Sequence, residues 1–259
     1  MQSLIRFDLL FPYAIPPILT LAASIFVVSL TIHAGRHVRE NQIFTLFCLG
    51  QSLYSVDLIL RTLITDPVIM LTITRLQHFS FVFLIPLGIH LAHALLKIHH
   101  RNWLIYLAYG YSLVMLPLSQ TRWYITETKL YFFGFFTHSG PLLTIYAIVA
   151  LPAALYVSVL LINAARTEAD LQRRIKFRFI SIGLICNSVL LILNVLPVLG
   201  LPVYPPSNFG FIPLSLMAYG ILQHQIFDTA KSWFYKGYIP RTLVVLIWTP
   251  LLGIVLFWL

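Results

Sequence analysis

Eight apolar runs, separated by short and mostly basic connections, occupy almost the whole of this 259-residue chain. The hydrocarbon core of a bilayer is about 30 Å thick, so a helix needs roughly 20 mainly apolar residues to cross it. The runs reach or approach that length, which predicts a membrane protein with many spans. They lie at 9–33, 42–65, 72–96, 103–119, 140–164, 179–199, 208–226 and 241–259.

Composition gives the whole chain the same membrane character. Hydrophobic residues make up 59% of the sequence and charged residues 10%, whereas soluble domains contain about 45–50% and 25%. Backbone polar groups inside a bilayer must be satisfied within helices or a closed barrel. The runs are continuously apolar and longer than barrel strands, which have about 10 residues. We therefore predict an all-α, polytopic transmembrane helix bundle of seven helices plus an eighth span.

Positive charge is arranged here as in a membrane protein. The formal net charge is +9, but the Lys and Arg residues gather in alternate connections, which argues against a nucleic acid partner. Cytoplasmic loops carry the excess of Lys and Arg, so we expect the N-terminus outside. Twelve such residues fall on the cytoplasmic side and four on the outer side. The twelve are Arg36, Arg39, Lys97, Arg101, Arg166, Arg173, Arg174, Lys176, Arg178, Lys231, Lys236 and Arg241; the four are Arg6, Arg75, Arg122 and Lys129.

The largest outer connection, 120–139, is rich in aromatic residues such as Trp123 and Phe133. Aromatic rings favour the headgroup level of a bilayer, so an interfacial belt is one interpretation. A short amphipathic strand or helix lying over the mouth of the bundle is the other.

Ionisable side chains inside spans mark functional sites or paired structural contacts. Asp57 and Arg61 are four residues apart in the second run, so they share a helix face and can pair. Tyr54 lies near the same face, and the third run begins on the same side with Arg75 and His78. One interpretation is an ion pair that locks the second and third helices together. The other is an outward-opening pocket with surplus positive charge, suited to an anionic or polar small ligand.

Further polar residues fall near this outer half. Asn187 and Asn194 share one stripe of the sixth helix, and Asn194 lies nearer the outer surface. Interhelical hydrogen bonds from Asn are an ordinary packing device, yet Asn194 is the better placed to line a pocket. Prolines at 86, 152 and 213 are expected to kink their helices. The candidate ligand-binding residues are Asp57, Arg61, Arg75, His78, Tyr54, Trp123 and Asn194.

The histidines raise the question of a metal or haem. His90 and His93 are three residues apart within a span, whereas His33 and His37 lie at the end of a helix. A bis-imidazole haem needs histidines that face one another from different helices. The histidines at the ends of helices are more simply interpreted as polar residues at the membrane interface. The sequence contains no HExxH motif and no Gly-rich phosphate loop. We therefore predict no metal, no cofactor and no catalytic residues.

A resemblance to a known family lies in residues 171–228, LQRRIKFRFISIGLICNSVLLILNVLPVLGLPVYPPSNFGFIPLSLMAYGILQHQIFD. There a basic loop leads into helix six, a Pro/Gly turn leads into helix seven, and helix seven closes on an aromatic-Gly segment, a polar pair and a Phe-Asp ending. Gly134 and Gly140-Pro141 also fit the pattern. The chain resembles the seven-helix sensor at the N-terminus of many bacterial histidine kinases. The closing residues are Tyr219, Gly220, Ile221, Leu222, Gln223, His224, Gln225, Ile226, Phe227 and Asp228.

The resemblance implies a sensor of the bacterial inner membrane whose kinase domain lies outside these residues. Residues 1–227 would form the seven-helix sensor, 228–240 an interfacial cytoplasmic elbow, and 241–259 an eighth transmembrane helix, as in variants with additional spans. The chain ends in an apolar run, so we expect it to be a fragment. The implied partners are a small ligand, the lipid bilayer and a cytoplasmic output domain of the same chain, with a homodimer as a further candidate.

Two other functions remain open from the sequence. A small-molecule transporter is compatible with the many spans, although the sequence has no convincing internal repeat of the kind that transporters often show. A haem-binding redox protein would use the intramembrane histidines.

The basic connection 166–178 anchors the chain by its charge, or it contacts an output domain or anionic lipid.

Overall fold

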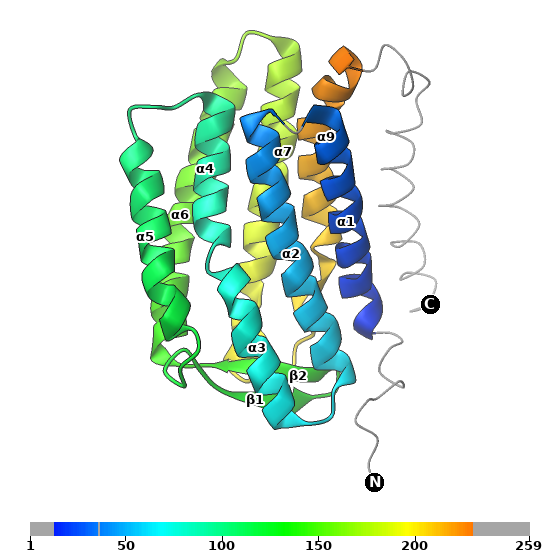
Figure 1. The fold of residues 1–259 in the computed structure, drawn as a ribbon, viewed down its shortest axis with the longest axis vertical. Coiled ribbons are helices and arrows are strands. Elements are labelled where there is room, and N and C mark those ends of the chain that lie inside the picture. Colours follow the sequence, from blue (N-terminus) through cyan, green and yellow to red (C-terminus); the bar gives the residue numbers. More distant parts are fainter. Residues whose placement is uncertain (1–12, 36, 230–259) are drawn as a thin grey trace.

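A computed structural model describes residues 13–35 and 37–229 of the chain as a bundle of helices with one β-hairpin at its end (Figure 1). Most of the predicted elbow at 228–240 and the whole predicted eighth span at 241–259 lie outside these residues. The elements are α1 (Ile15–Gly35), α2 (Arg39–Leu63), α3 (Pro67–Phe81), α4 (Leu84–Leu96), α5 (Asn102–Leu118), β1 (Ile125–Tyr131), β2 (Gly134–Ser139), α6 (Pro141–Thr167), α7 (Leu171–Leu193), α8 (Val195–Val198), the 3₁₀ turn η2 (Pro206–Phe209) and α9 (Phe211–Thr229).

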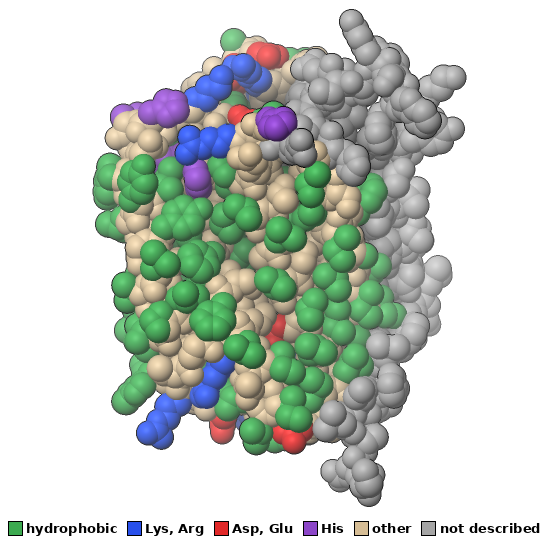
Figure 2. Space-filling model, in the orientation of Figure 1, with side chains coloured by type: hydrophobic (Ala, Val, Ile, Leu, Met, Phe, Trp, Pro, Cys, Tyr) green, Lys and Arg blue, Asp and Glu red, His purple; other side chains and the backbone are tan. Residues whose placement is uncertain are grey.

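The bundle confirms the all-α, polytopic architecture. Five stretches of helix in the described residues are long and apolar enough to cross a membrane; they are Ile15–Ile32, Arg39–Leu63, Pro67–Leu96, Pro141–Thr167 and Leu171–Val198. Apolar side chains cover the middle of the face seen in Figure 2. On α6, Ile148 is 65% exposed and Leu155 is 58% exposed. Such apolar exposure suits contact with lipid, in which no hydrophobic penalty applies to these residues.

The third predicted span is divided into two helices, α3 and α4. Asp66 caps the start of α3 by accepting hydrogen bonds from the backbone N–H groups of Val68 and Ile69. The division at residues 82–83 has a local cause, because Pro86 has no N–H to donate to the Val82 carbonyl four residues earlier. The Ser112 hydroxyl on α5 donates to this carbonyl instead, at 2.6 Å.

The other two predicted kinks turn out differently. Pro213 lies in the first turn of α9, where a missing N–H breaks no helical hydrogen bond, so the prediction of a kink there was wrong. Pro152 lies inside α6, which runs from Pro141 to Thr167, and the kink expected there stays a prediction.

The main core lies among α1, α2, α4, α5, α6, α7 and α9, around fully buried side chains such as Phe44, Leu91, Leu161, Ile180 and Met217. Glycines allow α7 and α9 to approach one another closely. A Cβ on Gly183 would come within 2.8 Å of the Pro213 carbonyl oxygen, and a Cβ on Gly220 within 3.0 Å of the Lys176 carbonyl oxygen. Small residues bring helix backbones together in this way in membrane bundles.

Strands β1 and β2 form an antiparallel hairpin that lies across one end of the bundle (Figure 1). Connection 120–139 therefore contains a strand that lies over the end of the bundle, as one of the two interpretations predicted, whereas the interfacial belt stays a prediction. Residues 134–137 of β2 are buried, whereas β1 is mostly exposed. The hairpin thus presents β2 to the helices and β1 to the outside of the bundle.

Candidate functional site

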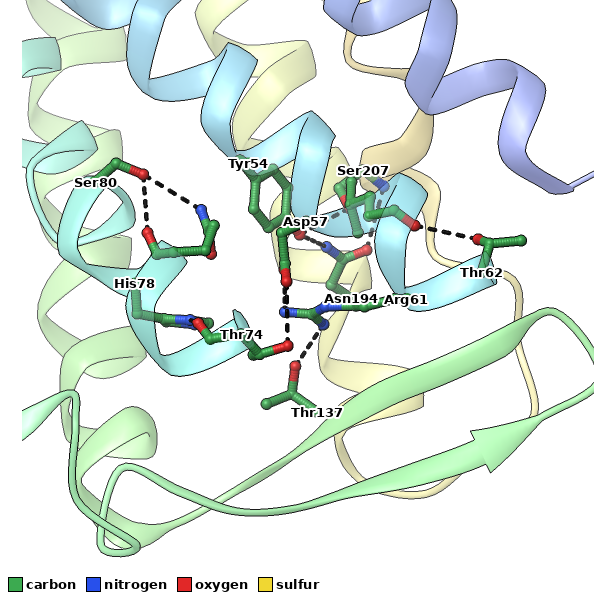
Figure 3. Close-up of polar contacts among 12 residues, drawn as sticks. Tyr54, Asp57, Arg61, Thr62, Thr74, His78, Ser80, Thr137, Asn194 and Ser207 are labelled. Atoms are coloured by element: carbon green, nitrogen blue, oxygen red, sulfur yellow. Dashed lines mark hydrogen bonds and ion pairs between the residues drawn. The ribbon is translucent and has the colours of Figure 1, made fainter. Parts of the chain in front are cut away.

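An ion pair between Asp57 and Arg61 lies buried at the hairpin end of α2 (Figure 3). The Arg61 Nη2 atom is 2.5 Å from the Asp57 Oδ2 atom, and the two residues are 3% and 1% exposed. The spacing of four residues along one helix predicted this pairing. Burial makes the pair mutually dependent, because either charge alone would be desolvated without compensation.

The hairpin touches this ion pair directly through Arg61. The Arg61 Nη1 atom donates a hydrogen bond of 2.5 Å to the Thr137 hydroxyl on β2. The guanidinium carbon also lies 5.1 Å from the centre of the Phe136 ring, within the range of a cation–π contact. The Arg61 Nε atom is buried and has no hydrogen-bond partner among the described residues. Arg61 therefore links α2 to the hairpin and keeps one donor unused.

On the other side of the pair, Asp57 is held by α3. The Thr74 hydroxyl donates to the Asp57 Oδ1 atom at 3.1 Å. His78 lies one turn further along α3 and donates from Nδ1 to the Thr74 carbonyl oxygen at 2.8 Å. The His78 ring lies 5.4 Å from the ring of Tyr124, which follows α5. His78 therefore reaches the cluster through Thr74 and packs against the base of the hairpin.

A second set of hydrogen bonds begins three residues earlier, at Tyr54. The Tyr54 hydroxyl accepts a hydrogen bond from the Asn194 side-chain amide at 3.1 Å and lies 3.0 Å from the Ser207 hydroxyl. The Asn194 side-chain oxygen, Oδ1, accepts a hydrogen bond from the backbone N–H of Ser207 at 3.2 Å. These contacts tie α2 to the end of α7 and to η2, the turn that precedes α9. Asn187 contacts α2 as well, because it accepts from the Gln51 amide at 3.0 Å.

Glycine at position 134 lets the hairpin lie directly on α2. Gly134 begins β2 with φ +119°, a backbone conformation that favours glycine. A Cβ at this position would come within 2.5 Å of the Arg61 carbonyl oxygen and 2.7 Å of the Thr62 Cα atom. The close approach places Thr137, three residues later, within reach of the Arg61 guanidinium.

Two of the predicted site residues lie away from the ion pair, at the base of the hairpin. The Arg75 guanidinium donates to the Ile125 carbonyl oxygen at 2.9 Å, and the Gln120 amide donates to the Arg75 carbonyl oxygen at 2.8 Å. Trp123 is 63% exposed. The structure therefore brings Asp57, Arg61, His78, Tyr54 and Asn194 into one cluster and leaves Arg75 and Trp123 at its edge.

Sequence reasoning missed the small polar partners of this cluster, namely Thr74, Thr137 and Ser207. Single Ser and Thr residues are common at every kind of position in a membrane protein, so their types carried no signal. Gly134 was noted only as part of a family pattern. A glycine inside an aromatic segment that forms a strand is a sign of close backbone approach, and it would have pointed to the hairpin.

Tyrosines of the hairpin end are buried outside the spans. Burial raises the pKa of the Tyr124 phenol, and nearby Tyr111 raises it further. The Tyr124 hydroxyl has no hydrogen-bond partner among the described residues. Burial also raises the pKa of the Tyr204 phenol, whose hydroxyl donates to the Tyr13 carbonyl oxygen at 2.7 Å.

The intramembrane histidines contact tyrosines in the part of the chain that the structure describes. His90 lies 3.3 Å from the Tyr109 hydroxyl and His93 lies 2.8 Å from the Tyr156 hydroxyl. The cluster at the hairpin end contains one acid, one guanidinium and several hydroxyl and amide groups. Groups of this kind are able to bind and orient a polar molecule through charge and hydrogen bonds.

The helices and this buried cluster define a multi-pass membrane protein whose spans are tied together beneath a β-hairpin at one end of the bundle. A family described as the N-terminal 7TM region of histidine kinase matches residues 18–230. The chain belongs to this family, and it is a membrane-embedded sensor region of a histidine kinase, a non-catalytic part of such proteins. The match confirms the resemblance seen in the sequence. No curated protein and no solved structure matches the chain significantly.

Proposed function

We propose that this sensor region receives a small polar or anionic ligand in its outer half and passes the resulting change in shape to a cytoplasmic output domain of the same chain. The observation that carries this proposal is the contact between Arg61 and Thr137. A buried guanidinium is held at the hairpin by a neutral hydroxyl group. An anionic ligand would bind that guanidinium more strongly than the hydroxyl does, because it adds the attraction between opposite charges to the hydrogen bond.

In this proposal the hairpin acts as the lid of the ligand site. A carboxylate that displaces Thr137 would accept a hydrogen bond from the Nη1 atom of Arg61, while Nη2 stays on Asp57 and the unused Nε–H offers a further donor on the other side of the guanidinium. Tyr54, His78 and Asn194 would supply hydrogen bonds around it. Arg75 and Trp123 lie at the base of the hairpin, where they would meet a ligand on its way in.

The orientation of the chain across the membrane in this proposal is inferred from the distribution of its Lys and Arg residues. The outer connections hold four Lys and Arg residues against twelve on the other side, so the hairpin would lie outside a bacterial inner membrane together with the N-terminus. With this orientation α9 runs from the hairpin end toward the cytoplasm (Figure 1). The output domain, and a second copy of the chain in a homodimer, would then meet the cytoplasmic end.

The hydrogen bonds of Tyr54 supply a route from the lid to α9. A shift of α2 that follows release of Thr137 would move Tyr54 relative to Asn194 and Ser207, and η2 leads directly into α9. A ligand moves such an equilibrium only by its difference in affinity for the two arrangements. Reversal of a population from 1:99 to 99:1 needs a difference of about 10⁴-fold.

The test uses the full-length protein in nanodiscs, with autophosphorylation measured against a panel of small carboxylates and amino acids. We expect at least one compound to change the activity, with its midpoint shifted at least tenfold in Arg61→Lys. Arg122→Lys is the matched control, because Arg122 is exposed in the connection before the hairpin. The proposal is wrong if no compound changes the activity, or if the midpoints agree in Arg61→Lys and the control.

A further inference from the structure

Two adjoining pockets lie at the end of the bundle opposite the hairpin. The first has a volume of about 370 Å³ and lies among the ends of α2, α4, α6 and α7. The second has a volume of about 380 Å³ and lies among α2, α4 and α5. Glu40 and Lys97 line both of them. Lys, Arg and His side chains gather at this end of the molecule (Figure 2).

Basic side chains surround the two pockets. The four cations are Arg39, Lys97, Arg173 and Lys176. None of them forms an ion pair with another described residue, and the carboxylates of Glu40 and Glu168 are the acids in the lining. Four positive charges against two negative charges leave a surplus of +2. A phosphate monoester carries about −1.5 to −2 at neutral pH, which matches this surplus.

His93 gives an independent sign of an absent partner. It lines the second pocket and is only 2% exposed. Its Nε2 atom lies 2.8 Å from the Tyr156 hydroxyl, but its buried Nδ1 atom has no hydrogen-bond partner among the described residues. Buried polar atoms are nearly always paired, so an unpaired nitrogen in the wall of a pocket points to a ligand that completes it.

Lys97 has an unusual backbone at the point where the pockets meet. It has φ +53° and ψ +39° at the end of α4, a left-handed conformation in which glycine is the usual residue. A side chain makes this conformation unfavourable. Strained residues that the fold maintains are concentrated at ligand sites. This left-handed backbone places Lys97, the lysine that lines both pockets, at the boundary between the two pockets.

The position of the pockets suits a ligand that comes from a membrane surface or from the adjoining water. Trp103 and Tyr106, in the first turns of α5 beside the second pocket, are 60% and 74% exposed. Aromatic side chains with this exposure mark the headgroup level of a bilayer. Basic pockets between transmembrane helices bind phosphorylated headgroups.

We propose that the two pockets that meet at Lys97 form one binding site for a phosphate group, carried either by a lipid headgroup or by a soluble phosphate compound. The phosphate would lie between Lys97 and Lys176, with Arg39 and Arg173 on either side. Bound there, it would connect the beginnings of α2 and α7 to the ends of α4 and α6. The site is separate from the Asp57–Arg61 cluster, so it does not depend on the proposed outer ligand.

The test measures binding to the full chain purified in detergent. One arm uses radiolabelled inorganic phosphate and the other uses phosphatidic acid, whose headgroup is a phosphate monoester, retained in native mass spectrometry. The variant is the double substitution Lys97→Gln and Lys176→Gln, and Lys129→Gln on the exposed hairpin strand is the matched control. We expect affinity for one probe to fall at least tenfold in the double variant and to stay unchanged in the control. The arm that responds identifies the source of the phosphate.

Glu40→Gln provides a second readout that does not depend on the stability of the double variant. Removal of an acid from the lining of both pockets should raise affinity for the same probe at least threefold. Lys97→Arg should keep at least a third of the natural affinity. The proposal is overturned if neither probe binds, or if binding is equal in the natural protein, Glu40→Gln and the variants that lack the lysines.

Discussion

The guanidinium of Arg61 on α2 donates a hydrogen bond to the hydroxyl of Thr137 on β2, 76 positions further along the chain. Through this bond the hairpin at the end of the bundle is attached to an ion pair buried among the helices. Hydrogen bonds to charged groups are worth about 1.5–3 kcal/mol, whereas loss of one member of a buried ion pair costs about 3–5 kcal/mol. Arg61 therefore stabilises both the buried ion pair with Asp57 and the attachment of the hairpin to α2.

Replacement of either charge alone should be much worse than replacement of both. Arg61→Leu leaves Asp57 buried without a counter-charge, and we expect a loss of about 3–5 kcal/mol in the free energy of unfolding. Asp57→Leu should have a similar effect. The double variant should lose clearly less than the sum, because two apolar side chains of similar volume replace the pair. Unfolding in mixed detergent micelles measures all three, and additive losses would contradict the pairing.

Thr137→Val tests the attachment of the hairpin without a change of shape. We expect faster hydrogen exchange at the backbone amides of residues 135–137, because the hairpin loses its charge-assisted bond to Arg61. The loss should be about 1.5–3 kcal/mol in the local opening free energy. Thr126→Val on the exposed strand is the control, since the Thr126 hydroxyl bonds only within the hairpin. Equal exchange in the two variants would rule out the attachment.

The contrast between Asp57 and Thr137 shows what the sequence can supply. Asp57 and Arg61 are one helical turn apart, so their pairing follows from the geometry of a single helix. The bond to Thr137 depends on how the hairpin is paired and where it lies, and no local pattern encodes that. Arg75 illustrates the same limit, because its position beside His78 in the sequence predicted convergence, yet it turns toward Ile125.

The span boundaries show a similar division between local and distant causes. Asp66 followed by Pro67 is a local start signal for α3. Pro86 predicted an irregularity in the third helix and accounts for the break at residues 82–83, but the Ser112 hydroxyl that bonds to the Val82 carbonyl oxygen comes from a different helix, and no local pattern encodes it. The closing segment of α9 could be recognised from the sequence, because consecutive residues of that one helix form part of the pattern that resembles the family, and the family match covers them.

Gly134→Ala should separate the hairpin from α2. The added Cβ would lie 2.5 Å from the Arg61 carbonyl oxygen, and alanine does not readily adopt a φ of +119°. We expect a loss of stability of about 1–3 kcal/mol, together with faster exchange of the hairpin amides. Gly110→Ala on α5 is the control, because its Cβ would meet nothing within 4 Å. Unchanged stability of Gly134→Ala would disprove the close approach.

The buried phenol of Tyr124 should make the free energy of unfolding depend on pH in the alkaline range. Burial raises the pKa of its phenol in the folded protein above the value of about 10 for an exposed tyrosine. The unfolded chain therefore loses this proton first, so stability is full below pH 10 and falls as the pH rises above it. Tyr124→Phe should fall less steeply between pH 10 and 11.5 and should be at least as stable as the natural protein at pH 7, because the buried hydroxyl has no partner among the described residues to lose. Melting curves at each pH measure this, and parallel curves would contradict it.

Gly183 controls the distance between α7 and α9. A Cβ there would come within 2.5 Å of the Met217 side chain and 2.8 Å of the Pro213 carbonyl oxygen, and backbone has little room to give way. We expect Gly183→Ala to destabilise the bundle by about 1–3 kcal/mol through overpacking. Under the proposed function, Gly183→Ala should also change the basal autophosphorylation of the full-length kinase, because α9 would connect the bundle to the cytoplasmic output domain.

Gly88→Ala on α4 adds the same methyl group where nothing lies within 4 Å of it, so it separates the effect of overpacking from that of a glycine substitution in general. Melting temperature and autophosphorylation are measured for both variants in the same nanodiscs. A fall in melting temperature with unchanged basal activity would leave α9 as a packed helix that carries no signal. A change in both, seen only for Gly183→Ala, would identify the α7–α9 contact as the part of the bundle that sets the resting output.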